Sequence, residues 1–191
     1  MLGKRHPRLD PFVPTGWDMV GKIIDFAEPD ENSVLVDLGS GDGRMVIEAA
    51  KRYGCASIGV ELNPQLVELA DKRARMLGLS NVSFLNADVR TVSLEGVTHV
   101  VAYLTSNALR EIEHILLTAP ADAVIVTHNY PIRGWQPVVV LDAWSSSDGK
   151  WHRLYKYTPR LSAPMLKKSK ALGASPRTSN TPLRLVKSWR P

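Results

Sequence analysis

The chain has 191 residues, of which 44% are hydrophobic and 23% charged, with a single cysteine. This length fits one domain with one core. The lone Cys55 excludes an internal disulfide and fits a reducing compartment. The sequence has no run of about 18 apolar residues, and its N-terminus lacks the apolar stretch of a signal peptide. We therefore expect no transmembrane segment and a cytoplasmic location.

Charge is distributed unevenly along the chain, although the net value is only +5. Three Lys or Arg side chains precede residue 9, eight follow residue 159, and all 19 acidic side chains lie between them. We therefore predict a basic N-terminal arm (1–10), a folded domain (11–159) and a basic, flexible C-terminal tail (160–191). The tail could bind an anionic partner such as nucleic acid or a membrane surface. It could instead only solubilise the protein, or dock on the body through Leu183, Leu185, Val186 and Trp189.

Helical stripes and short apolar runs alternate along the predicted domain. Residues with helical spacing occur at 20–27, 46–53, 67–77 and 109–116, with Thr15 as a candidate cap of the first helix and Asn63-Pro64 opening the third. Strands are expected before the glycines at 39–43 and at 57–60, 82–85, 97–102 and 124–127. Two β-rich runs, 137–144 and 151–157, flank a turn-forming cluster and predict a hairpin. The pattern indicates a doubly wound α/β sheet.

Residues 36–43 read V-D-L-G-S-G-D-G and predict a strand that ends in a cofactor-binding loop. Glycines let the backbone turn tightly and approach a ligand without a Cβ in the way. A dinucleotide fingerprint would need its third glycine at position 44, where the chain has Arg44. The loop also lacks the Gly-Lys-Ser/Thr ending of a P-loop. Binding of NAD and of ATP is therefore disfavoured.

Three acids stand at or just after the ends of successive predicted strands. Asp37 precedes the glycine loop, Glu61 ends the second strand, and Asp88 follows the third. A carboxylate at the tip of the second strand can accept hydrogen bonds from both hydroxyls of a ribose. Asp88 could receive the exocyclic amine of an adenine. The ligand indicated is an adenosine-containing cofactor.

These three segments, V-D-L-G-S-G-D-G, G-V-E-L-N-P and N-A-D-V, resemble in order and spacing the class I S-adenosylmethionine-dependent methyltransferases over about residues 33–127. The resemblance implies a Rossmann-like sandwich with a mostly parallel seven-stranded sheet and a C-terminal antiparallel β-hairpin. It also implies S-adenosylmethionine as cofactor and S-adenosylhomocysteine as product. The positions that it assigns to cofactor binding are Asp37, Gly39, Ser40, Gly41, Glu61, Leu62, Asp88 and Val89.

The fourth predicted strand should deliver the residue that faces the transferred methyl group, and it ends Ala102-Tyr103-Leu104-Thr105. The Asn/Asp-Pro-Pro-aromatic signature of amino-group methylases of nucleic acid bases is not found there. Tyr103 is our candidate catalytic residue, because its ring can hold an amine by cation–π contact and its hydroxyl can orient a lone pair. The alternative is a tyrosine that only packs.

Further segments resemble one branch of this family: P-F-V-P-T at 11–15, Y-L-T-S-N-A-L at 103–109 and H-N-Y-P-I-R-G-W-Q-P at 128–137. The branch comprises archaeal protein lysine methyltransferases and relatives that methylate a lysine of the ATP synthase c-ring. The resemblance implies methyl transfer to lysine side chains of protein substrates. An RNA methyltransferase that holds RNA with the tail, a small-molecule methylase and a non-catalytic cofactor-binding module are the alternatives.

The histidines are expected to be structural. His128 follows the fifth predicted strand and is interpreted as pinning the loop after it. His6, His99, His114 and His152 lack the spacing of metal ligands, so we expect no metal site.

Overall fold

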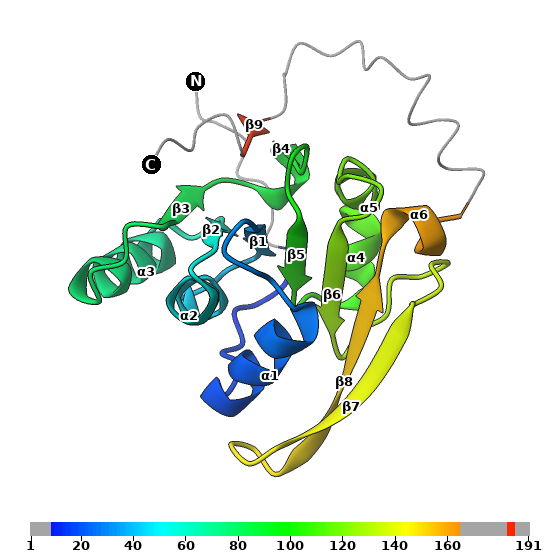
Figure 1. Cartoon of the computed structure of the whole chain (residues 1–191), viewed down its shortest axis with the longest axis horizontal. Helices are drawn as coiled ribbons and strands as arrows, with labels where there is room; N and C mark the ends of the chain where they lie inside the picture. Colours follow the sequence, from blue (N-terminus) through cyan, green and yellow to red (C-terminus); the bar gives the residue numbers. More distant parts are fainter. Residues whose placement is uncertain (1–8, 165–182, 186–191) are drawn as a thin grey trace.

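One seven-stranded sheet with the strand order β3-β2-β1-β5-β6-β8-β7 forms the centre of the protein (Figure 1). The computed structural model describes residues 9–164 and 183–185. Five neighbouring strands run parallel, β8 is antiparallel to β6, and β7 returns antiparallel to β8. The strands are β1 (Val34–Leu38), β2 (Ala56–Glu61), β3 (Val82–Asn86), β5 (His99–Ala102), β6 (Val124–His128), β7 (Val139–Ser145) and β8 (Lys150–Tyr157). The predicted sheet with its terminal hairpin is confirmed.

Helices cover both faces of the sheet, and the alternation of side chains along each strand creates two cores. On β1, Leu35 packs into the core shared with α1 and α2, whereas Val36 faces the core shared with α4 and α5. On β5, Val101 likewise packs into the core shared with α1 and α2, and Val100 into the core shared with α4 and α5. The helices are α1 (Trp17–Ala27), α2 (Arg44–Tyr53), α3 (Pro64–Met76), α4 (Ser106–Glu111), α5 (Glu113–Leu116) and α6 (Pro159–Ser162). Strands buried on both sides explain the continuous apolar runs of the sequence.

The helix boundaries agree with the sequence signals in some places and differ in others. Asn63 caps α3 by accepting a hydrogen bond from the Gln65 N–H, as predicted. Thr15 does not cap α1, because the helix begins one residue later and Gly16 occupies the N-cap position. The stripe predicted as one helix over 109–116 is divided between α4 and α5, since Ile112 is not helical.

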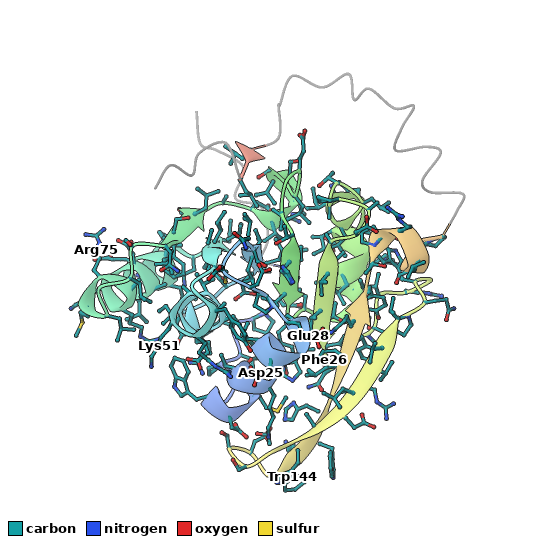
Figure 2. All side chains as sticks on the ribbon, in the orientation of Figure 1. Asp25, Phe26, Glu28, Lys51, Arg75 and Trp144 are labelled. Carbon is teal, nitrogen blue, oxygen red and sulfur yellow. The ribbon has the colours of Figure 1, made fainter. Side chains whose placement is uncertain are left out.

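The C-terminal hairpin is fastened to α1 at both ends of the helix. Near the hairpin turn, Asp18 accepts hydrogen bonds from Ser146 and Ser147. At the other end, Lys156 on β8 forms an ion pair with Glu28 at 2.8 Å and lies 4.7 Å from the centre of the Phe26 ring. Figure 2 shows Phe26 and Glu28 where the end of α1 approaches the hairpin. These contacts fix the position of the hairpin relative to the rest of the sheet.

A short segment of the C-terminal region joins the body of the domain. Strand β9 (Leu183–Arg184) pairs in parallel with β4 (Val92–Ser93), and Leu185 is 2% exposed within the larger core. For residues 183–185 the structure therefore corresponds to the docking alternative. The predicted domain boundary at 159 falls at the start of α6, whose Ser162 is buried. The remaining tail residues and the arm at 1–8 lie outside the described residues.

Two glycines with positive φ border α2 and allow a matched test. Gly43 is the N-cap (φ 81°), and an added Cβ would lie 2.7 Å from atoms of Ala70 and Phe84. Gly54 is the C-cap (φ 69°), and a Cβ there would meet no atom within 4 Å.

Gly43→Ala is expected to lower the free energy of unfolding by about 2–5 kcal/mol, since backbone strain adds to overpacking. Gly54→Ala has the strain alone and should cost about 1–2 kcal/mol. Urea denaturation of both variants measures the difference. Equal losses would show that the packing around Gly43 yields without cost.

Candidate cofactor and acceptor site

The carboxyl ends of five parallel strands meet at one edge of the sheet. The chain passes outward from β1 to β2 and β3 and then returns to place β5 on the other side of β1, so the strand order reverses between β1 and β5. Ligands of doubly wound sheets bind at such a reversal. A cavity lies there, and the predicted site residues that line it are Asp37, Gly39, Ser40, Glu61, Leu62, Asp88, Val89 and Tyr103. Sequence motifs that are far apart along the chain are thus brought together.

The glycine loop fixes the orientation of Glu61. The N–H of Gly41 donates to Glu61 Oε2 at 3.1 Å, and the N–H of Asn63 donates to Oε1 at 2.7 Å. A carboxylate has about four acceptor positions, so two remain for a ligand. Gly41 itself does not line the cavity. It lies beneath Phe12, whose ring would overlap with a Cβ at this position.

Asp37 is a buried carboxyl group at the end of β1, 5% exposed. No described residue is seen to donate a hydrogen bond to it. Burial, followed by the nearby carboxylates of Glu61 and Asp42, raises its pKa to about 8. A cation bound in the cavity would stabilise the ionised form of Asp37, which burial and the charges of Glu61 and Asp42 disfavour. The site therefore suits a ligand that carries positive charge.

A second buried acid of the loop, Asp42, is structural in its contacts. It forms ion pairs with Arg44 at 2.6 Å and with Arg73 at 2.5 Å. Burial acts to raise the pKa of Asp42, but the hydrogen bonds from both arginines outweigh this and hold the pKa below its usual value. Arg44 also donates to the Thr15 carbonyl and lies 5.3 Å from the centre of the Trp17 ring. The G-D-G-R sequence thereby ties the loop to the start of α1.

Asp88 is held in place by Arg90. It is the N-cap of a short 3₁₀ helix, η1 (Val89–Thr91), and accepts the Arg90 backbone N–H at 2.9 Å. Its carboxylate also forms an ion pair with the Arg90 guanidinium at 2.6 Å. The side chain is therefore oriented at the cavity wall before any ligand binds. The Arg90 contact was not predicted from the sequence.

The N-terminal segment 9–13 lines the cavity. The sequence did not predict a role for this segment in the site. Asp10 fastens it by accepting hydrogen bonds from the Thr105 backbone N–H at 2.7 Å and from the Thr105 hydroxyl at 2.9 Å. Thr105 is in turn the N-cap of α4. In the sequence, this segment is signalled only by P-F-V-P-T, one of the branch-like motifs. Asp10, whose hydrogen bonds hold the segment, directly precedes that motif.

The cavity is also lined by aromatic rings from the ends of β5 and β6. Tyr103 lies with its ring centre 4.2 Å from that of His128, at an angle of 40°. Tyr130 also lines the cavity. Burial, followed by the neighbouring His152, lowers the pKa of His128 to about 4, so its imidazole is neutral near pH 7. The part of the cavity that these rings line therefore differs in chemistry from the part that the acids line.

The donor set fits S-adenosylmethionine in its chemistry. That cofactor carries an ammonium and a sulfonium, and the cavity offers the buried Asp37 carboxyl. It also carries a ribose, and Glu61 has acceptor positions to spare. Ser40 Oγ is buried and has no hydrogen-bond partner among the described residues. A ligand with several polar groups would satisfy these atoms.

Comparison with known proteins decides the family. The model of the ANTKMT methyltransferase domain matches residues 37–139, which is more than half of the chain. The chain belongs to this family. The methyltransferase fold and the use of S-adenosylmethionine, both implied by the sequence resemblance, are confirmed.

Individual relatives of this methyltransferase carry different names. A protein-lysine N-methyltransferase of Saccharolobus islandicus (strain REY15A) is 28% identical over 151 residues, which is 77% of this chain and 92% of that enzyme. A lysine N-methyltransferase of Homo sapiens, named for the c-subunit of ATP synthase, is 33% identical over 129 residues, 66% of this chain. The match spans only 54% of the human enzyme.

A solved structure also matches this methyltransferase. It is described as an RNA methyltransferase from Salinibacter ruber in complex with S-adenosyl-L-homocysteine. It is 32% identical with a TM-score of 0.73 and covers 80% of this chain and 97% of its own. These proteins are all named as methyltransferases and differ in the acceptor they are named for. No helix within the described residues is long and apolar enough to cross a membrane.

The raised pKa of Asp37 leads to a pH-dependent prediction for cofactor binding. Near pH 7 a carboxyl with a pKa of about 8 is mostly protonated, and a cationic ligand favours its ionised form. Binding of S-adenosylmethionine should therefore release a proton, and affinity should rise with pH up to about 8 and then level off. Calorimetry in two buffers of different ionisation enthalpy measures the proton release. Asp37→Asn should abolish it, and release that persists in this variant would assign it to another group.

Proposed function

We propose that this enzyme transfers a methyl group from S-adenosylmethionine to the side-chain amine of lysine in protein substrates. The observation that carries the proposal is a group of aromatic rings, Tyr103, Tyr130 and His128, that lines the same cavity as the acids. We call this group the acceptor end and the acid-lined part the donor end. The archaeal relative that this chain matches over 92% of its length is named for the same reaction.

The roles of the donor-site residues are part of this proposal. Glu61, held by two backbone N–H groups, accepts the ribose hydroxyls, and Asp37 balances the positive charge of the ligand. Asp88, oriented by Arg90, receives the adenine amine. The backbone of Gly39 and Ser40 and the side chains of Leu62 and Val89 form the walls between these acids. When bound, S-adenosylmethionine supplies an electrophilic methyl group.

The acceptor end suits a long alkyl-amine. The rings of Tyr103 and Tyr130 provide π faces for an ammonium and apolar surface for its alkyl stem. An amine in such surroundings loses its proton more easily than in water, because burial disfavours the charged form. The neutral amine is the form that attacks a methyl group. Tyr103 is the candidate for orienting it.

Labelled methyl transfer tests the proposal. Purified enzyme and tritiated S-adenosylmethionine are incubated with native extract, and mass spectrometry then locates the modified residue. The expected product is methyl-lysine in protein. Cofactor binding by calorimetry without transfer to any fraction would instead indicate a non-catalytic binding module.

RNA is the second candidate acceptor, favoured by the name of the Salinibacter structure. In the same extract, label that survives protease and is lost to ribonuclease would establish it. The basic tail, as a grip for an anionic partner, lies largely outside the described residues and stays a prediction. Replacing Lys167, Lys168 and Lys170 by glutamine should weaken RNA binding and reduce its dependence on salt if the tail holds RNA.

A further inference from the structure

His128 carries a buried nitrogen that no contact within the described part of the domain explains. The residue ends β6, is 2% exposed and lines the acceptor end of the cavity beside Tyr103. Its Nδ1 has no hydrogen-bond partner among the described residues. Buried polar atoms are paired in the great majority of cases. An unpaired nitrogen in a residue that lines the cavity therefore points to a ligand group that completes it once the ring or its neighbours shift to expose the atom.

The other nitrogen of His128 begins a chain of polar contacts that reaches the surface. His128 Nε2 lies 2.8 Å from His152 Nδ1, and His152 Nε2 lies 3.1 Å from Asp148 Oδ2. Asp148 stands in the turn between β7 and β8 with a side chain 43% exposed. The hairpin thus connects the cavity to an exposed carboxylate through two imidazoles.

The carboxylate determines which nitrogens carry protons. Asp148 has a lowered pKa because of its hydrogen bond with His152, so it is ionised and acts only as an acceptor. His152 therefore donates from Nε2, and its Nδ1 is an acceptor in the neutral imidazole. Asn129 Nδ2, 3.2 Å from the same His152 Nδ1, donates to it as well. His128 in turn donates from Nε2, and its Nδ1 presents a lone pair.

On the basis of the lysine methylation proposed above, we propose that His128 Nδ1 takes the proton of the substrate ammonium, with His152 and Asp148 as positioning residues. One N–H bond of the ammonium breaks, its electron pair stays on the amine nitrogen as the attacking lone pair, and a new N–H bond forms at Nδ1. The imidazolium is stabilised through His152 by the Asp148 carboxylate. Its proton passes to water when the products leave.

The groups around His128 are consistent with this role. Burial and His152 lower its pKa, whereas Asp148 raises it. Tyr103 packs on its ring, and Asn129 follows it in the chain. His128 is thus neutral before the substrate binds, but its lowered pKa makes it a weak base. It can take the proton only from an ammonium whose own pKa is lowered by burial in the cavity. The expectation from sequence that His128 only pins a loop is replaced by this proposal.

The decisive variant is His128→Gln, because the glutamine amide can still donate to His152 but offers no basic nitrogen to the substrate. We expect kcat with a lysine-containing substrate to fall by about 100-fold at pH 7. The loss should shrink to less than about tenfold at pH 9.5, where about a tenth of the free amine has already lost its proton, against less than about a thousandth at pH 7. The Kd for S-adenosylmethionine should stay within about twofold of the wild-type value. A loss of equal size at all pH values would indicate a structural role and overturn the proposal.

Asp148→Asn tests the far end of the chain of contacts without touching the cavity. We expect kcat at pH 7 to fall by about 3- to 10-fold, since the positive charge formed on His128 loses its carboxylate. The matched control is Asp142→Asn on the same hairpin, whose partner is Arg153 at 2.6 Å and whose side chain is 50% exposed. The control should leave kcat unchanged. Equal effects of both variants would contradict the proposed connection.

Nitrogen NMR of histidine-labelled protein provides a readout that does not depend on turnover. His128 Nδ1 should show the shift of an unprotonated nitrogen, and its Nε2 that of an N–H. The reverse tautomer would overturn the inference.

If the wild-type enzyme methylates no lysine, the proposed function fails. If it methylates lysine and His128→Gln is as fast as wild type, only the inference about His128 fails.

Discussion

Glu61→Gln is expected to weaken S-adenosylmethionine binding by about 100-fold. Both carboxylate oxygens of Glu61 accept backbone N–H groups, from Gly41 and Asn63, and their remaining positions are assigned to the ribose. A glutamine has only one carbonyl oxygen. Its NH₂ group cannot accept a hydrogen bond, so one of the two backbone N–H groups loses its acceptor. Each hydrogen bond to a charged group contributes about 1.5–3 kcal/mol. Loss of one such bond, at about 2.7 kcal/mol, accounts for the expected factor.

Isothermal titration calorimetry of the purified variant measures this loss. Glu68→Gln on α3 is the matched control, because Glu68 is exposed and does not line the cavity. It should bind as tightly as wild type. The thermal midpoint of Glu61→Gln without ligand should remain within a few degrees of wild type, which separates binding from folding. Unchanged affinity in Glu61→Gln would remove the ribose contact from the site.

Tyr103→Ala is expected to reduce kcat by about 30-fold or more while leaving the Kd for S-adenosylmethionine nearly unchanged. The ring stands at the exit of β5 and packs against His128, so its removal takes away the π face and loosens the imidazole. A desolvated cation–π contact contributes about 2 kcal/mol or more, which corresponds to this factor.

Tyr103→Phe divides that effect between ring and hydroxyl. If the ring holds the amine, phenylalanine should retain most of the activity; if the hydroxyl orients the lone pair, it should lose most of it. Tyr53→Phe at the C-terminal end of α2, where the hydroxyl contacts Asp25, is the control and should have wild-type kcat. Full activity in Tyr103→Ala would assign Tyr103 to packing alone.

The parts of the fold that depend on local periodicity could be predicted. Leu35 and Val36 alternate between two cores, Asn63 and Pro64 open a helix, and each strand end was placed within a few residues. The pairing of β4 with β9 could not be predicted, because each strand has only two residues and the two strands lie far apart in the sequence. Short strands have no periodicity to read, and their stability comes from tertiary packing.

In the candidate site, too, features set by local periodicity could be predicted and features set by long-range contacts could not. Asp37, Glu61 and Tyr103 stand directly at strand ends, so alternation of helices and strands was enough to bring them to one edge. The Asp10 anchor and the histidine pair join elements whose order in the sheet carries no short sequence signature. His128 and His152 are 24 residues apart and meet only because β8 inserts antiparallel beside β6. Such contacts require the register of the sheet.

The docking of Leu185 limits how the tail can be tested. Burying a leucine side chain contributes about 2 kcal/mol, and Leu185 lies in the same core cluster as Leu94 and Val92. A protein shortened after residue 164 would lose this side chain and the β4–β9 pairing, so any drop in partner binding would be mixed with a drop in folding. Charge-neutralising substitutions keep the chain length intact. The C-terminal region therefore belongs partly to the architecture of the enzyme, and its role in recognition must be measured with the full chain.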